Sequence, residues 1–255
     1  MEIGLQAILG GLMLVGIRVS GLMLFAPFLG HAAIPMRIKA ATVVLITAAL
    51  YPAYASRLPA LEVSRWPLLV LSELLVGVAM GIATNLVFES AQLAGQILSV
   101  QMGYSLVNIL DPQTQVDTTV VSVFHQTLVL LIFLQLDVHH WILRGIGKSF
   151  DYLPPGAATA NLTFVNALLR GVGGLLEIGI QIAAPVLAAT LVADLAMGFL
   201  GKASPQMPLL LLGPAVKSLL GLTVLGVALK YWPALFEHYF TESVALGERL
   251  LHLAH

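Results

Sequence analysis

Long apolar runs alternate with short polar stretches along the whole chain. The runs lie near residues 3–30, 40–55, 67–88, 90–110, 119–136, 172–200 and 207–232. A helix needs about 20 mostly apolar residues to cross the hydrocarbon part of a bilayer. Because lipid cannot satisfy backbone polar groups, such runs should be helical, and none of them alternates with the two-residue period of a strand. The pattern therefore predicts an all-α, polytopic membrane protein.

The composition agrees with a membrane protein and argues against nucleic acid as a partner. Of the 255 residues, 58% are hydrophobic and 10% are charged, whereas about a quarter of the residues of an ordinary soluble domain are charged. A net charge of -1 provides no basic surplus for nucleic acid, and the lack of Cys excludes disulfides and thiolate metal sites. No basic stretch precedes the first apolar run, so we expect a retained helix rather than a cleaved signal peptide.

Prolines and glycines interrupt the apolar runs. The prolines in or beside them are Pro27, Pro35, Pro52, Pro67, Pro185, Pro205, Pro208 and Pro214. Each removes a backbone donor and should kink or end its helix. The stretch GVAMG, with Gly77 and Gly81, allows close backbone packing, although glycine is also simply common in membrane helices. Basic residues do not fall into alternate loops as the positive-inside rule expects, which we interpret as a sign that other subunits surround some helices.

Five charged residues lie inside apolar runs: Glu73, Glu89, Glu177, Asp194 and Lys217. Each charge would cost at least about 2.5 to 3.5 kcal/mol at the centre of a bilayer. We expect these side chains to face protein, a pore or an interface. They are either helix-end residues and ion pairs, such as a glutamate with Lys217, or part of a conduit. A proton relay would require them to lie within reach of one another, which spacing alone does not show.

The sequence offers no catalytic motif and a weak metal motif. His139 and His140 follow Asp137, but adjacent side chains on a helix point about 100° apart, so we favour an interfacial His-Trp pair with Trp141 over a metal site. There is neither a nucleophile elbow nor a phosphate-binding or dinucleotide-binding glycine motif. We therefore predict a protein that is not an enzyme and holds no metal or cofactor.

A polar stripe leads into the most unusual segment of the chain, residues 101–119. Its members recur at close to helical spacing: Gln92, Gln96, Gln101 and Ser105. Asp111-Pro112 should then break the helix. Since non-helical backbone at membrane depth is tolerated only inside protein or at a cavity, the segment is either a loop at a pore mouth or an ordinary turn.

Several stretches also carry a family resemblance. They are RVSGLMLFAPFLGHAAIPMRIK (18–39), ELLVGVAMGIATNLVFESAQLAGQILSVQMGYS (73–105), Asp111-Pro112, FLQLDVHHWILRGIGKSFDYLPPG (133–156) and SPQM with Lys217 downstream. In this order and spacing they resemble the flagellar biosynthetic protein FliR family, the export-gate subunit of type III secretion, whose injectisome relatives are the SctT proteins. The HH, SF and LPxG features resemble the flagellar branch more than the injectisome branch.

The resemblance implies a structural and gating subunit of a protein export gate in the bacterial inner (plasma) membrane, at the flagellar basal body. One copy would assemble with FliP-type and FliQ-type subunits, beside FlhB/FlhA-type components, and form part of the pore for unfolded protein substrates. Residues 1–255 would form one membrane domain of kinked helices and hairpins, FliP-like over about 1–200 and FliQ-like over about 201–255. The alternatives are an injectisome (SctT-type) gate and an independent ion-coupled transporter that uses Glu73, Glu177 and Asp194.

The resemblance also implies a plug that closes the channel. The matching gate loop is 103–119, with Gly103, Tyr104, Ser105, Asp111, Pro112 and Gln113. One motif departs from the family pattern, in which PQ is followed by Asn, an aromatic residue and Gly-x-Pro-x-Lys. Here Met207 precedes Pro208, and Pro214 stands one position before the expected proline, although Lys217 keeps its place.

Overall fold

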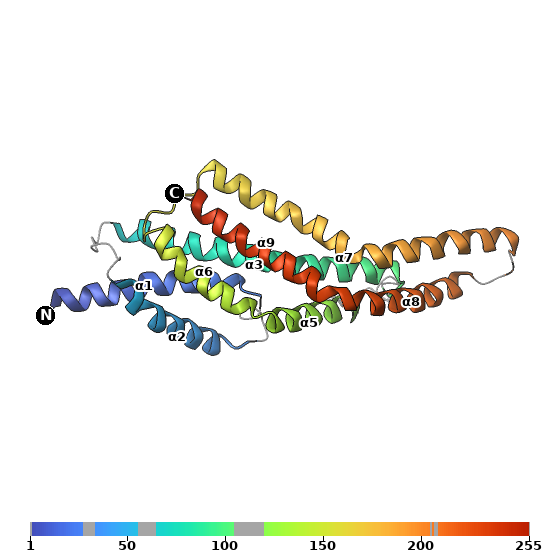
Figure 1. The fold of residues 1–255 in the computed structure, drawn as a ribbon, viewed down its shortest axis with the longest axis horizontal. Helices are drawn as coiled ribbons and strands as arrows, with labels where there is room; N and C mark the ends of the chain where they lie inside the picture. Colours follow the sequence, from blue (N-terminus) through green and yellow to red (C-terminus); the bar gives the residue numbers. More distant parts are fainter. Residues whose placement is uncertain are drawn as a thin grey trace, which may run out of the picture. The chain divides into compact units, whose positions relative to one another are not determined.

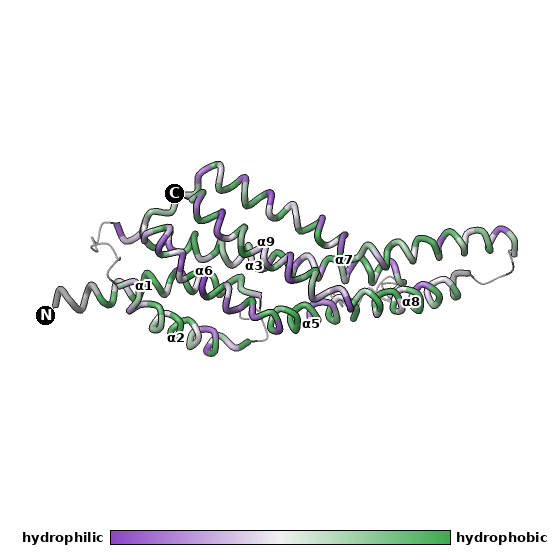
Figure 2. Tube along the Cα trace, viewed as in Figure 1, coloured by the Kyte–Doolittle hydropathy of each residue, from purple (hydrophilic) through white to green (hydrophobic). Residues whose placement is uncertain are grey.

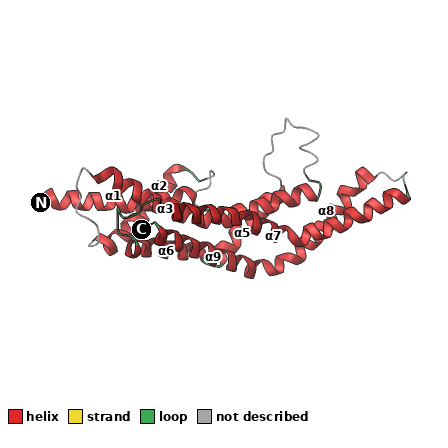
Figure 3. Ribbon diagram, turned by 90° about the horizontal axis from the view of Figure 1, so that it is seen from above, coloured by secondary structure: helices red, strands yellow, loops and turns green. Residues whose placement is uncertain are grey.

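The computed structural model describes residues 2–27, 34–55, 65–104, 120–204, 206 and 209–254, with the backbone alone at 2–7 and 209–211. Over these residues it contains helices and loops and no strand (Figure 3). The helices are α1 (Glu2–Phe25), α2 (Met36–Tyr54), α3 (Trp66–Gln101), α5 (Val120–Gln135), α6 (Val138–Tyr152), α7 (Leu162–Ala203), α8 (Leu209–Ala228), the 3-10 helix η4 (Leu229–Tyr231) and α9 (Trp232–Leu253) (Figure 1).

Within the described residues, five helical stretches are long and apolar enough to cross a membrane. They are Ile8–Phe25, Met36–Tyr54, Trp66–Gln101, Leu162–Ala203 and Leu212–Leu253, the last of which joins α8, η4 and α9. Helices α5 and α6, bent by 66° at their junction, could form a sixth span. Figure 2 shows apolar residues dominating α5, whereas α6 carries polar residues at intervals. The predicted all-α, polytopic membrane fold is confirmed.

The helix boundaries differ from the apolar runs at several places. The runs 67–88 and 90–110 form one helix, α3, which passes through Glu89 and ends at Gln101, so the prediction that Asp111-Pro112 ends this helix was wrong. Helices α6 and α9 were not marked by apolar runs, because both carry many polar residues. Hydropathy alone therefore located the apolar helices and missed the amphipathic ones.

Three of the prolines do not end their helices. Pro52, Pro185 and Pro214 lie inside α2, α7 and α8, each of which continues past its proline. Neighbouring helices can meet the backbone carbonyls that a proline frees. Pro35 directly precedes α2, and Pro67 lies in the first turn of α3, where a missing N–H is tolerated.

The chain divides into two compact units. Unit 1 comprises Met1–Leu86, Leu134–Gly173 and Tyr239–His255, and unit 2 comprises Val87–Phe133 and Gly174–His238. These units are defined by contacts within the chain, whereas the predicted boundary near residue 200 concerns likeness to two sister subunits. That boundary stays a prediction.

In unit 1, α1 packs closely against α3 through glycine. A Cβ atom on Gly77 would overlap the backbone oxygen of Arg18, and one on Gly21 would lie 3.0 Å from the backbone oxygen of Leu74. Gly81 likewise faces Leu22 of α1. The small residues of GVAMG therefore serve a helix contact inside the chain.

In unit 2, the last turns of α3 pack against α5 and α7. Gly95 faces the backbone of Ser122 on α5, and Gly179 of α7 faces Leu93. Phe88 and Phe133 add an edge-to-face contact with ring centroids 5.4 Å apart. These contacts fix the end of α3, where the predicted gate loop begins.

Candidate functional site

Helix α3 ends in a hydrogen-bonded glycine motif. The N–H of Gly103 donates to the oxygen of Val100 at 3.1 Å, and the N–H of Tyr104 donates to the oxygen of Ser99 at 2.9 Å. Gly103 has a φ of 86°, a left-handed conformation that favours glycine. The two bonds and this φ make a Schellman motif, which explains why α3 stops at Gln101 and not at Asp111-Pro112.

The residues after α3 lie against α8. The Tyr104 hydroxyl lies 2.6 Å from Ser218 Oγ, so these two hydroxyls share a hydrogen bond. A Cβ on Gly103 would come within 2.9 Å of Pro214 Cβ, and one on Gly221 would come within 2.8 Å of Met102 Cγ. Both glycines lie in close contact with the opposite segment, so α8 approaches the start of the gate loop closely.

An ion pair joins α7 to α8 beside the same turn. Lys217 Nζ lies 3.0 Å from Asp194 Oδ1 and 3.3 Å from Asp194 Oδ2. Gln101 Nε2 donates to Asp194 Oδ2 at 3.1 Å. The Lys217 side chain is 18% exposed and that of Asp194 is 39% exposed, so the pair is partly open to its surroundings. One carboxylate thereby links α3, α7 and α8.

We call this group the loop-base cluster: Gln101, Gly103, Tyr104, Asp194, Lys217 and Ser218. It unites the end of the predicted polar stripe, the start of the predicted gate loop and two of the five predicted charges. Ser218 was missed, since a lone serine in an apolar run gives no signal in the sequence. The expected pairing of a glutamate with Lys217 was wrong: the carboxylate that pairs with Lys217 is that of Asp194.

The other stripe residues lie apart from this cluster. Gln92 and Gln96 are half-buried on α3, and their side chains form no hydrogen bond with any described residue. Ser105, Asp111, Pro112 and Gln113 of the predicted gate loop lie outside the described residues.

Glu73 has a different environment, at the centre of unit 1. Arg18 Nε lies 2.6 Å from Glu73 Oε2, Arg18 Nη2 lies 3.0 Å from Glu73 Oε1, and both side chains are fully buried. Arg18 also donates to Ser149 Oγ at 3.0 Å and to the oxygen of Leu153 at 3.1 Å. Its Cζ lies 3.9 Å from the centroid of the Phe150 ring. This pair joins α1, α3 and α6 and is a structural element.

The remaining predicted charges are on helix surfaces. Glu89 is exposed on α3. Glu177, exposed on α7, accepts a hydrogen bond from Gln181 Nε2 at 3.2 Å. The carboxylates of Glu73, Glu177 and Asp194 thus each have a different partner: Arg18, Gln181 and Lys217. This arrangement does not favour the ion-coupled transporter.

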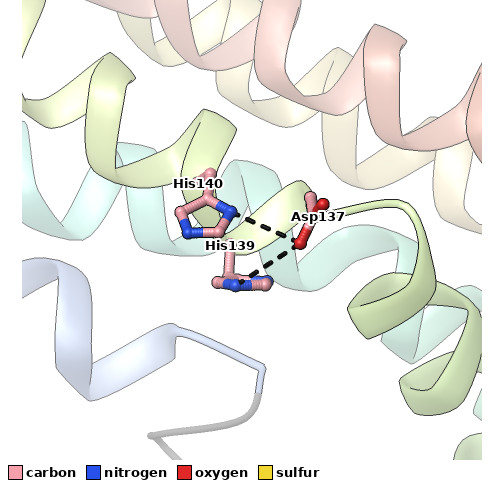
Figure 4. A group of neighbouring side chains, drawn as sticks. All are labelled: Asp137, His139 and His140. Atoms are coloured by element: carbon pink, nitrogen blue, oxygen red, sulfur yellow. Dashed lines mark ion pairs between the residues drawn. The ribbon is translucent and has the colours of Figure 1, made fainter.

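The first turn of α6 brings Asp137, His139 and His140 together (Figure 4). Asp137 Oδ1 lies 3.9 Å from His139 Nε2 and 3.4 Å from His140 Nδ1. The expectation that the two imidazoles point apart was wrong, since their ring centroids are 4.1 Å apart; both rings turn toward the carboxylate. One potential ligand atom from each residue falls within 4.8 Å of the others, so the group could hold a metal ion by distance. That the chain binds no metal stays a prediction.

Comparison with known proteins identifies the family. The family described as "Bacterial export proteins, family 1" matches residues 9–243. The chain belongs to this bacterial export protein family. Its similar relatives include the flagellar biosynthetic protein FliR of Bacillus subtilis, 28% identical over 94% of each chain. FliR of Escherichia coli is 28% identical, and FliR of Pectobacterium carotovorum is 31% identical; each comparison covers 89% of this chain and 87% of the relative.

The export-protein match covers all of unit 2, most of unit 1 and the whole loop-base cluster, since Gln101 to Ser218 lie inside residues 9–243. The predicted family resemblance is therefore confirmed. Pro214, which stands one position before the proline of the family pattern, packs directly against Gly103 at the start of the gate loop.

Proposed function

We propose that this chain is a structural and gating subunit of a flagellar type III protein export gate. One copy assembles with FliP-type and FliQ-type subunits, next to FlhB/FlhA-type components, in the bacterial inner membrane at the flagellar basal body. The relatives named as flagellar biosynthetic protein FliR, which align over most of the chain, support this proposal. An injectisome (SctT-type) gate is less well supported, because these relatives are flagellar.

The loop-base cluster is the observation that carries the gating role. Two contacts hold the start of the gate loop to α8: Gly103 against Pro214 and Tyr104 bonded to Ser218. Beyond the loop, α5 is held against α3 where Ser122 meets Gly95. Both ends of the loop are therefore anchored in one compact unit. A plug needs such anchors because it must return to the same position each time the pore closes.

In the mechanism that we propose, unfolded export substrates pass a pore partly lined by this subunit, and the gate loop blocks that pore at rest. Opening would shift α8 relative to α3 and α7. The partly exposed Asp194–Lys217 pair is suited to such a shift, since an ion pair in contact with water exchanges its partner at low free-energy cost. The driving force would come from the proton-motive force and from a partner ATPase.

Native mass spectrometry of the tagged chain, purified from its own membrane, tests the assembly. We expect a heteromeric mass that contains one copy of this chain with FliP-type and FliQ-type subunits. A chain that is found alone and that transports an ion-coupled solute in liposomes without those subunits would instead be an independent transporter.

Deleting residues 106–116 tests the gating role. We expect the assembled complex to keep its mass and to leak small solutes faster in proteoliposomes, because the plug is gone. Deleting residues 57–63, between α2 and α3, is the control and should leave permeability unchanged. Equal permeability in the wild-type complex and a correctly assembled 106–116 deletion would contradict the plug.

A further inference from the structure

A pocket of about 510 Å³ lined by two arginines lies in unit 1, between the first turns of α7 and the last turns of α9. Thr163, Asn166 and Arg170 line it from α7, and Leu246, Arg249 and Leu253 line it from α9. The lining positions are spaced three and four residues apart on each helix, so each helix presents one face to the pocket. Two arginines of different helices thus share one concave site.

The walls of the pocket are held by the loop before α7. Asn161 Nδ2 donates to the oxygen of Leu253 at 2.6 Å, and the Thr159 N–H donates to the oxygen of Ala254 at 2.7 Å. Asn161 Oδ1 also accepts the N–H of Phe164 at 2.8 Å, which caps α7. At the floor, a Cβ on Gly171 would lie 2.7 Å from Leu246 Cδ2, so glycine permits the close approach of α7 and α9. The pocket is preformed.

The positive charge of the pocket is uncompensated within the described part of the chain. Arg170 and Arg249 form no ion pair or hydrogen bond with any described residue, and neither do the side chains of Thr163 and Asn166. Four side chains with hydrogen-bond donors therefore line one cavity, and none of them has a partner among the described residues. Guanidinium groups bind phosphate with two parallel hydrogen bonds each, which makes a phosphate group the ligand that best fits this chemistry.

The surroundings of the pocket favour a phosphate that carries acyl chains. Both helices belong to stretches that are long and apolar enough to cross a membrane, and the pocket lies at their ends, Leu162 and Leu253. Beside the pocket, α7 exposes an apolar face made of Leu162, Val165, Leu169 and Val172. Figure 2 shows how polar and apolar residues alternate along this first part of α7. We propose that the pocket binds the phosphate headgroup of an anionic phospholipid, whose acyl chains lie on that apolar face.

Lipid binding to the purified export complex tests this site. The complex in neutral detergent is titrated with phosphatidylglycerol, and bound lipid is counted by native mass spectrometry. We expect R170Q/R249Q to bind phosphatidylglycerol roughly thirtyfold more weakly, since each basic residue near a membrane contributes about a factor of five. The control R144Q/K148Q removes two exposed basic charges of α6 outside the pocket and should weaken binding less than about threefold. Phosphatidylcholine should bind all three proteins alike.

Three results would overturn the proposal. Equal weakening in R170Q/R249Q and R144Q/K148Q would show a general charge effect. Displacement of the bound lipid by low concentrations of inorganic phosphate would show that the pocket binds a free anion. Loss of sister subunits from R170Q/R249Q, with no lipid retained by the wild-type complex, would show that an acidic protein surface occupies the pocket.

Discussion

Two ion pairs of this chain, Arg18–Glu73 and Asp194–Lys217, differ in burial and therefore in how much stability each is expected to contribute. In unit 1, Arg18 and Glu73 meet at 2.6 Å with both side chains fully buried. In unit 2, Lys217 and Asp194 meet at 3.0 Å with side chains 18% and 39% exposed. Both pairs join separate helices, but only the side chains of the second are partly exposed on the chain.

We infer from this difference which part of the chain is held in one arrangement and which part can rearrange. Breaking a buried pair leaves an unpaired charge in a dry interior and costs about 3 to 5 kcal/mol. An exposed pair contributes about 0 to 1 kcal/mol, because water replaces the lost partner. We infer that the Arg18–Glu73 pair holds unit 1 in one arrangement, and that the Asp194–Lys217 pair can open at the base of the gate loop.

The largest effect is expected at the buried pair. Glu73→Gln should lower the free energy of unfolding by about 3 to 5 kcal/mol, because the Arg18 guanidinium would stay buried without a countercharge. Thermal unfolding in mild detergent, together with the yield of folded chain, measures the loss. If Glu73→Gln were as stable as the wild-type chain, the buried pair would contribute no more to stability than the partly exposed pair, and the inferred difference between them would be wrong.

The double variant R18M/E73L separates charge from packing. It removes both charges while keeping apolar volume at the site, so it should recover much of the stability lost in Glu73→Gln. A double variant less stable than the single one would show that the hydrogen bonds of the pair, and not the missing countercharge, dominate. These bonds run from Arg18 to Ser149 and Leu153 and from the Gly156 N–H to Glu73.

A second, smaller effect is expected where α1 meets α3. Gly77→Ala places a Cβ against the backbone oxygen of Arg18, and such overpacking costs about 1 to 3 kcal/mol of unfolding free energy. The matched control is Gly173→Ala on α7, where a Cβ would meet no atom within 4 Å. It should be neutral or stabilising by up to about 1 kcal/mol. Equal melting temperatures for the two variants would show that α1 and α3 can move apart freely.

Sequence patterns identified the membrane class well, because burial in lipid demands long apolar runs whatever the tertiary structure. They also identified Glu73, Asp194 and Lys217, since charges in such runs are conspicuous. The same logic did not pair Glu73 with Arg18: the two residues are 55 positions apart, and a pairing over that separation depends on how the helices pack.

Local chemistry explains the remaining differences. The end of α3 was expected at Asp111-Pro112, yet the signal that decides it is Gly103, whose left-handed φ completes the Schellman motif. Glycine is frequent in membrane helices, so a single glycine in a sequence does not mark a helix end. The hydrogen bonds around Gly103 identify the end of α3, and they are visible only in the structure. Likewise, the convergence of His139 and His140 depends on the Asp137 carboxylate that both rings approach.

The smallest effect on stability, and the most informative for function, is expected at the exposed pair. Lys217→Met should lower the free energy of unfolding by less than about 1 kcal/mol, because Asp194 keeps its hydrogen bond from Gln101 and is already partly exposed. It should nevertheless raise solute leakage through the assembled gate, since α8 would lose one of its links to α7 beside the loop.

The exchange D194K/K217D restores opposite charges and should return leakage toward the wild-type value, at the expense of the Gln101 bond. Leakage that is unchanged in Lys217→Met, or that is not reduced again by the exchange, would mean that this pair does not control the gate loop.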